Sequence, residues 1–133
     1  MASTDTTEIG TRRGFRLHPT VFAPRISRRL VYELCDSAGL PEVLVDDAAF
    51  VIGELVTESI RQSRRDVEVE GQLTGQQITV RVRNAKSSAP PIERQATNTP
   101  TRNSATVRHL AASWGCCRYQ YGWEVWAVLR SRP

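Results

Sequence analysis

The stretch PEVLVDDAAFVIGELVTESIRQS, residues 41–63, carries the longest regular hydrophobic pattern in this chain of 133 residues. Its apolar and small residues recur every three or four positions, which places them on one face of an α-helix. They are Leu44, Ala48, Val51, Ile52, Leu55, Ser59 and Ile60. Pro41 suits a first helical position, because a backbone N–H there would have no partner within the helix. We therefore expect a helix from residue 41 to about residue 63, with one face packed against other elements.

The residues before this stretch predict a shorter helix and a strand. Ile26, Leu30 and Leu34 form an apolar stripe at helical spacing, so a helix that faces the core with these residues is expected over residues 24–38. Before it, residues 14–21 predict a short edge strand, because a proline near its end would remove a hydrogen-bond donor from a central position.

After the long helix the hydrophobic period changes from 3.6 to 2, which predicts strands. Apolar and polar residues alternate over residues 67–73 and 78–83, and Thr74-Gly75-Gln76 joins the two runs as a turn. Residues 85–103 have no periodicity and contain three prolines, so a long loop is expected there. A short helix around Val107 and two final strands, at residues 116–121 and 123–130, are expected to complete the chain.

This order of elements predicts an α+β fold with two layers, in which helices cover one face of a mostly antiparallel mixed sheet. The folded domain is expected over residues 14–131, after a flexible tail over residues 1–13. No apolar run reaches the length of a membrane span and no secretory signal precedes the domain, so we expect a cytoplasmic protein without a membrane partner. The cysteines, Cys35, Cys116 and Cys117, are odd in number and lack metal-ligand spacing, so neither disulfides nor a metal site is expected.

The net charge of +4 comes from arginines that are dispersed along the chain, apart from a loose group near the N-terminus. A nucleic-acid-binding face is usually concentrated and carries a recognisable motif, so nucleic-acid binding is not favoured. Within the loose group, Arg25, Arg28 and Arg29 lie off the apolar stripe of the expected 24–38 helix. They are either solvated surface residues or the binding surface for an acidic protein partner.

Several short motifs follow one another in a recognisable order. Asp46-Asp47-Ala48 and then Glu54-Leu55-Val56-Thr57 lie in the long helix, Trp114-Gly115 precedes a strand, and Val125-Trp126-Ala127 lies in the last strand. Together they resemble the histidine-kinase-like ATPase superfamily, and specifically the small anti-sigma-factor serine kinases of bacteria. The resemblance spans about residues 14–130, implies the histidine-kinase-like ATPase fold, and puts the 85–103 loop in place of the ATP lid.

The resemblance also marks candidate site residues. Glu54 stands at the position of the family's catalytic glutamate, Glu58 replaces the asparagine that holds Mg²⁺, and Gln62 falls where a histidine is common. Asn84 lies in the stretch that replaces the adenine-reading Asp-x-Gly motif, and Asn103 lies where the family has a glycine-rich lid. These residues are the candidate ATP and Mg²⁺ site, which has lost most of the family's residue types.

Elementary chemistry leaves two interpretations of these residues. Glu54, Glu58 and Gln62 line one helix face, and either Mg²⁺ or Arg61, three residues beyond Glu58, would neutralise the carboxylates. Asn84 shares the parity of the buried strand positions, so it either contacts adenine or caps the loop that follows. The side chain of Asn103 is best suited to capping the next helix.

Two functions are compatible with this sequence. The first is a regulatory protein of anti-sigma-factor type, with little or no kinase activity and no required cofactor. Its partner would be a sigma factor, an anti-sigma antagonist or a second copy of the chain. The second is an active ATP-dependent serine/threonine kinase that uses ATP and Mg²⁺ at an unusual site. The combined loss of the nucleotide motifs favours the first.

Overall fold

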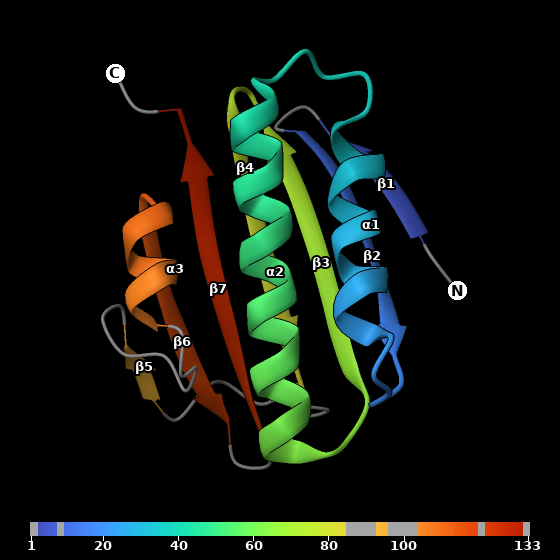
Figure 1. The fold of residues 1–133 in the computed structure, drawn as a ribbon, viewed down its shortest axis with the longest axis vertical. Coiled ribbons are helices and arrows are strands. Elements are labelled where there is room, and N and C mark those ends of the chain that lie inside the picture. Colours follow the sequence, from blue (N-terminus) through green and yellow to red (C-terminus); the bar gives the residue numbers. More distant parts are fainter. Residues whose placement is uncertain (1–2, 8–9, 85–92, 96–103, 120–121, 132–133) are drawn as a thin grey trace.

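The computed structural model describes residues 3–7, 10–84, 93–95, 104–119 and 122–131. Figure 1 shows one sheet with helices packed across it. The elements are β1 (Ser3–Thr7), β2 (Gly10–Leu17), α1 (Ala23–Cys35), α2 (Glu42–Ser63), β3 (Val67–Thr74), β4 (Gln77–Arg83), β5 (Glu93–Gln95), α3 (Ser104–Leu110), β6 (Ser113–Tyr119) and β7 (Gly122–Arg130). None of the helices in the described ranges is long and apolar enough to cross a membrane.

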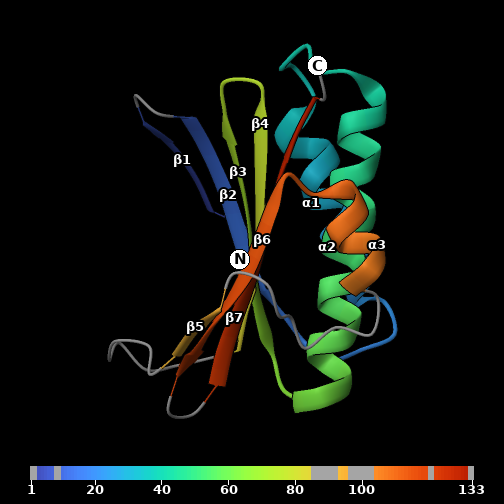
Figure 2. The ribbon, with the colours of Figure 1, turned by 90° about the vertical axis from the view of Figure 1, so that its left-hand side faces the viewer.

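The sheet has seven strands in the order β1-β2-β3-β4-β7-β6-β5. The three helices of the described residues cover the same face of the sheet, and no described helix covers the other face (Figure 2). The predicted two-layer α+β sandwich is therefore confirmed. Every strand pair in the described part of the chain is antiparallel, so the mixed sheet that we expected is not found there.

The core lies between α2 and the centre of the sheet. Val51, Ile52 and Leu55 of α2 are fully buried against it, as are Val80 of β4 and Ala127 of β7. The alternation in β3 and β4 and the helical spacing in α2 both follow from this one packed face. The hydrophobic pattern of the sequence thus predicted the long helix α2 and the hairpin of β3 and β4 correctly.

A glycine allows α1 to pack closely on the sheet. Gly71 of β3 lies under α1, and a Cβ atom added there would be 2.9 Å from Cδ2 of Leu34 and 3.0 Å from Cδ2 of Leu30. Real Cβ atoms do not approach other carbons so closely, since carbon–carbon contacts are optimal at about 3.5–4.0 Å. The missing side chain at Gly71 therefore sets the distance between α1 and β3.

The N-terminal region differs from the expectation. Residues 3–7 and 10–13, which we expected in a flexible tail, form strands, and β2 lies between β1 and β3 instead of at an edge. These residues carry no apolar alternation, so they resemble a tail when the sequence is inspected alone. They form strands because β2 pairs with β3 and β1 pairs with β2, which depends on backbone groups of neighbouring strands and not on a local pattern.

Two boundaries also differ near the expected 85–103 loop. Residues 93–95 form β5, which pairs with β6, so a strand lies within the loop; the rest of the loop is outside the described residues. The following helix ends at Leu110, and Trp114-Gly115, which we expected just before a strand, lies inside β6. Trp114 is buried, because β6 directs it toward the core.

Candidate functional site

The C-terminal half of α2 brings three of the candidate residues together. Glu58 is almost fully buried, with 6% of its side chain exposed. Its Oε2 accepts a hydrogen bond of 3.0 Å from Nε of Arg61, and its Oε1 accepts one from Nη2 of the same guanidinium. Gln62 donates to Oε1 from Nε2 at 3.3 Å. Glu54 lies one turn earlier on α2 and is half-buried.

The Glu58–Arg61 pair is a two-pronged ion pair, in which two N–H groups of one guanidinium point at the two oxygens of one carboxylate. Such pairs are shorter and stronger than neutral hydrogen bonds. The hydrogen bond to Glu58 raises the pKa of Arg61 above its usual value. Arg61, one of the two cations that the sequence left open, pairs with the carboxylate of Glu58, and this carboxylate is buried instead of lying on a solvated stripe.

This arrangement does not fit a divalent metal. Mg²⁺ requires oxygen ligands in near-octahedral geometry at about 2.0–2.1 Å and usually keeps several waters. At Glu58 both oxygens already accept hydrogen bonds, and hardly any of the side chain reaches water. In the part of the chain that the structure describes, no group of three or more His, Cys, Asp or Glu side chains is placed to hold a metal ion.

Asn84 connects two strands. Its backbone N donates to the carbonyl oxygen of Trp123 at 3.1 Å, and its Oδ1 accepts from the backbone N of Trp123 at 2.8 Å. The side chain therefore continues the β4–β7 ladder by one more pair. The side-chain oxygen of Asn84 is thus bonded to the neighbouring strand β7. The loop that follows Asn84, which the side chain was expected to cap in one of the two interpretations, lies outside the described residues. Asn103 lies outside the described residues.

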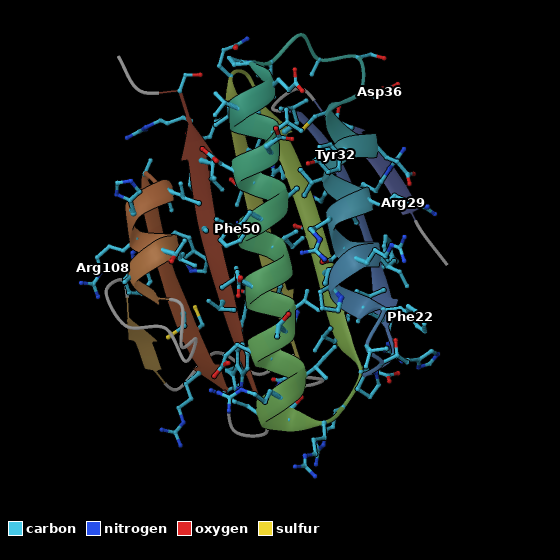
Figure 3. All side chains as sticks on the ribbon, in the orientation of Figure 1. Phe22, Arg29, Tyr32, Asp36, Phe50 and Arg108 are labelled. Carbon is cyan, nitrogen blue, oxygen red and sulfur yellow. The ribbon has the colours of Figure 1, made fainter. Side chains whose placement is uncertain are left out.

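The outward face of α1 carries the predicted basic group. Arg25, Arg28 and Arg29 are all exposed, and Figure 3 shows Arg29 and Phe22 on this helix. Arg28 also has a packing role, because its side chain lies over Gly53 of α2. A Cβ atom at Gly53 would be 3.2 Å from Nη1 of Arg28.

Exposed apolar side chains lie next to these arginines. Val21 is 88% exposed, Phe22 59% and Ile26 41%. Ile26 was predicted to face the core, and this prediction is wrong, because Ser27 is buried in the same turn instead. Ser27 satisfies its hydroxyl by donating to the carbonyl oxygen of Pro24 at 2.7 Å. The start of α1 is therefore apolar as well as basic on its outer side, and only the basic part was predicted from the sequence.

A second contact holds α1 to α2. The phenol of Tyr32 donates a hydrogen bond of 2.7 Å to Oδ1 of Asp46, and this bond raises the pKa of Tyr32 above its usual value of 10. Phe50, on the outer side of α2, is 40% exposed. Both helices thus carry an exposed aromatic side chain.

The comparisons with known proteins give one informative result. No family model matches the chain, and no curated protein sequence matches it. Among solved structures, it is similar to the crystal structure of the RsbU and RsbW domains of Rv1364c from Mycobacterium tuberculosis. The TM-score is 0.66 at 16% sequence identity, over 90% of this chain and 33% of the other. The chain thus spans about a third of the length of that crystallised chain, and the similarity confirms the fold.

Two hollows lie apart from the candidate residues on α2. One, of about 410 Å³, lies on the face of the sheet that no described helix covers and is lined by charged side chains, among which Arg81 pairs with Glu70 at 3.1 Å. The other, of about 390 Å³, lies between the start of α2 and the end of α3. Neither of these two hollows is lined by Glu54, Glu58 or Asn84.

Proposed function

We propose that this chain is a regulatory protein of anti-sigma-factor type, which acts by binding another protein and has little or no kinase activity. The observation that carries the proposal is the outer start of α1. There Val21, Phe22 and Ile26 are exposed beside Arg25 and Arg29. Exposed aromatic and arginine side chains are the types that most often anchor protein–protein interfaces. A partner that fits this surface carries acidic groups around an apolar patch.

The contacts of Glu58 on α2 support the proposal that the chain transfers no phosphoryl group. Phosphoryl transfer depends on positioned phosphates and on a metal that neutralises their charge. Glu58 stands where the resemblance places the metal-holding asparagine, and its oxygens are bonded to Arg61 and Gln62. Asn84 engages its side-chain oxygen with β7. These contacts support a degenerate nucleotide site; a binding protein requires none of the groups that are missing.

The nature of the partner follows from the fold and the surface together. The sequence resembles anti-sigma-factor kinases, and the similar solved structure contains a domain named RsbW. We therefore propose a sigma factor or an anti-sigma antagonist as the partner, with a second copy of the chain as a further possibility. The chain would act in the cytoplasm, where such partners are found.

The test uses purified protein and a partner captured from the source cells and then purified itself. Arg25 and Arg29 are replaced together by Ala, and Arg28 is kept because it packs on Gly53. The matched control replaces Arg108 of α3 and Arg130 of β7, which are exposed. Both elements lie on the other side of α2 from α1 (Figure 1). Calorimetry should show binding at least tenfold weaker for the first variant and unchanged for the control, a loss of about 1.4 kcal/mol or more. Equal affinities for both variants would refute the proposed surface.

The alternative is an active serine/threonine kinase, and one observation favours it. Glu54 is retained at the position of the family's general base and is only half-buried. Titration with ATP and Mg²⁺ decides between the two. We expect a dissociation constant no better than about 1 mM, or roughly −4 kcal/mol. Micromolar binding, together with loss of regulation in Glu54→Ala, would establish the kinase instead.

A further inference from the structure

We infer that Arg61 is the resident counter-cation of Glu58, so that α2 keeps its buried carboxylate neutralised without any metal ion. The inference concerns the same helix as the proposed loss of nucleotide handling and rests on that proposal for its functional meaning. Its physical basis is separate, because it depends only on the contacts of Glu58, Arg61 and Gln62.

The two charged side chains of the pair differ in their exposure to water. Glu58 points inward with 6% of its side chain exposed, whereas Arg61 is 44% exposed and lies at the surface. The guanidinium therefore closes the carboxylate off from water. Gln62 adds a third donor, so the two carboxylate oxygens accept three hydrogen bonds from residues on their own helix.

Because Glu58 is buried and Arg61 is exposed, substitutions of the two residues should have different effects on stability. A buried carboxylate that loses its partner keeps the cost of its desolvation and has nothing to offset it. An exposed arginine that loses its partner turns to water at little cost. Removing Arg61 should therefore destabilise the protein far more than removing the charge of Glu58, although both changes break the same pair.

The pair also governs access of a metal ion. A divalent cation that reaches Glu58 must displace the guanidinium and shed several of its own waters, and Mg²⁺ gives up water reluctantly. The cation that is already present is covalently attached, so its effective concentration beside the carboxylate is high. We therefore expect Mg²⁺ to leave the wild-type protein unaffected and to act on this helix only when Arg61 is absent.

The experiment measures the thermal midpoint of unfolding by circular dichroism, with and without MgCl₂. The variants are Arg61→Gln, Glu58→Gln and the double substitution, with Arg65→Gln as a control that removes the same charge from an exposed neighbour. Arg61→Gln should lower the midpoint by several degrees, and Glu58→Gln by clearly less. The double variant should recover most of the loss caused by Arg61→Gln. Mg²⁺ should raise the midpoint of Arg61→Gln alone.

Other outcomes would overturn the inference. If Arg61→Gln costs no more than Arg65→Gln, or if the two substitutions at the pair are additive, Arg61 does not neutralise Glu58. A rise of the wild-type midpoint with Mg²⁺ alone would show that a metal reaches the carboxylate despite Arg61. If Arg61→Gln does not fold, Arg61→Lys keeps the charge but loses the two-pronged geometry, and it should fall between wild type and the double variant.

These results are separable from the proposed function. Failure of the coupling between Glu58 and Arg61 leaves partner binding through Arg25 and Arg29 untouched. Conversely, unchanged partner binding in the α1 variants would refute the proposed surface while the stability pattern of the pair still stands.

Discussion

Adding one methyl group at Gly71 should destabilise this protein, whereas the same change at Gly53 should not. Both glycines are buried and both lie where two elements pack together. At Gly71 the new Cβ would be 2.9 Å from Leu34 and 3.0 Å from Leu30, which belong to the packed core. At Gly53 it would be 3.2 Å from the flexible end of Arg28, which is exposed.

The magnitudes follow from these contacts. At Gly71 both leucine methyl groups must retreat by about 0.5–1 Å to regain an ordinary carbon contact. Overpacking of this kind costs about 1–3 kcal/mol, and replacing a strand glycine returns roughly 0.5–1 kcal/mol, so the expected net loss is about 1 kcal/mol. At Gly53 the guanidinium can move, and alanine is favoured over glycine in a helix by about 1 kcal/mol. The expected net result there is a gain of about 0.5 kcal/mol.

Urea unfolding monitored by tryptophan fluorescence and circular dichroism measures both changes. Gly71→Ala should lower the midpoint and Gly53→Ala should leave it equal or raise it, with similar slopes for all three proteins. A Gly71→Ala protein as stable as wild type would show that α1 does not approach β3 as closely as described. Equal losses at both glycines would show that the identity of the displaced neighbour does not decide the cost.

Three further predictions concern single contacts. Replacing Tyr32 by Phe should cost about 0.5–1 kcal/mol of unfolding free energy, because the hydrogen bond to Asp46 is lost. In a protein that keeps Tyr32, Asp46→Asn should lower the pKa of the Tyr32 phenol, which a titration followed by ultraviolet absorbance measures. Burial raises the pKa of the Cys35 thiol from its usual 9.0 to about 11, so the native state favours the neutral thiol. The contribution of this thiol to the free energy of unfolding is fully present below about pH 9 and is lost as the pH rises toward 11. In urea titrations at alkaline pH, Cys35→Ala should therefore show a smaller loss of stability over this range than wild type. Asn84→Ala should cost about 1 kcal/mol and speed hydrogen exchange at the Trp123 amide, and unchanged exchange would contradict the contact.

Elements with a long, regular pattern were predictable, and elements that depend on distant partners were not. The helix expected over residues 41–63 is α2, Glu42–Ser63, and the expected hairpin is β3 and β4. In contrast, β1 and β5 hold few or no residues with an apolar pattern of their own. A short polar segment becomes a strand only when a neighbouring strand offers its backbone groups, and the sequence does not contain that information locally.

The candidate site shows the same division. The spacing of Glu58 and Arg61 allowed an ion pair, but the same spacing suited a solvated stripe or a metal. Burial decided between them, because a carboxylate that is 6% exposed needs its partners fixed. Likewise, the parity of Asn84 placed it on the inner face, yet its partner is the Trp123 backbone, which is 39 residues away along the chain.

The sequence by itself determined the order of the helices and of the strands other than β1 and β5, the two-layer fold class and the residue types at each nucleotide-site position, since these depend on local periodicity and on side-chain chemistry. The tertiary structure alone decided the strand order β1-β2-β3-β4-β7-β6-β5, the outward direction of Ile26 and the burial of Glu58 under Arg61. Each of these depends on which surfaces compete for the same buried space. That competition involves segments far apart in the chain, and only their packing resolves it.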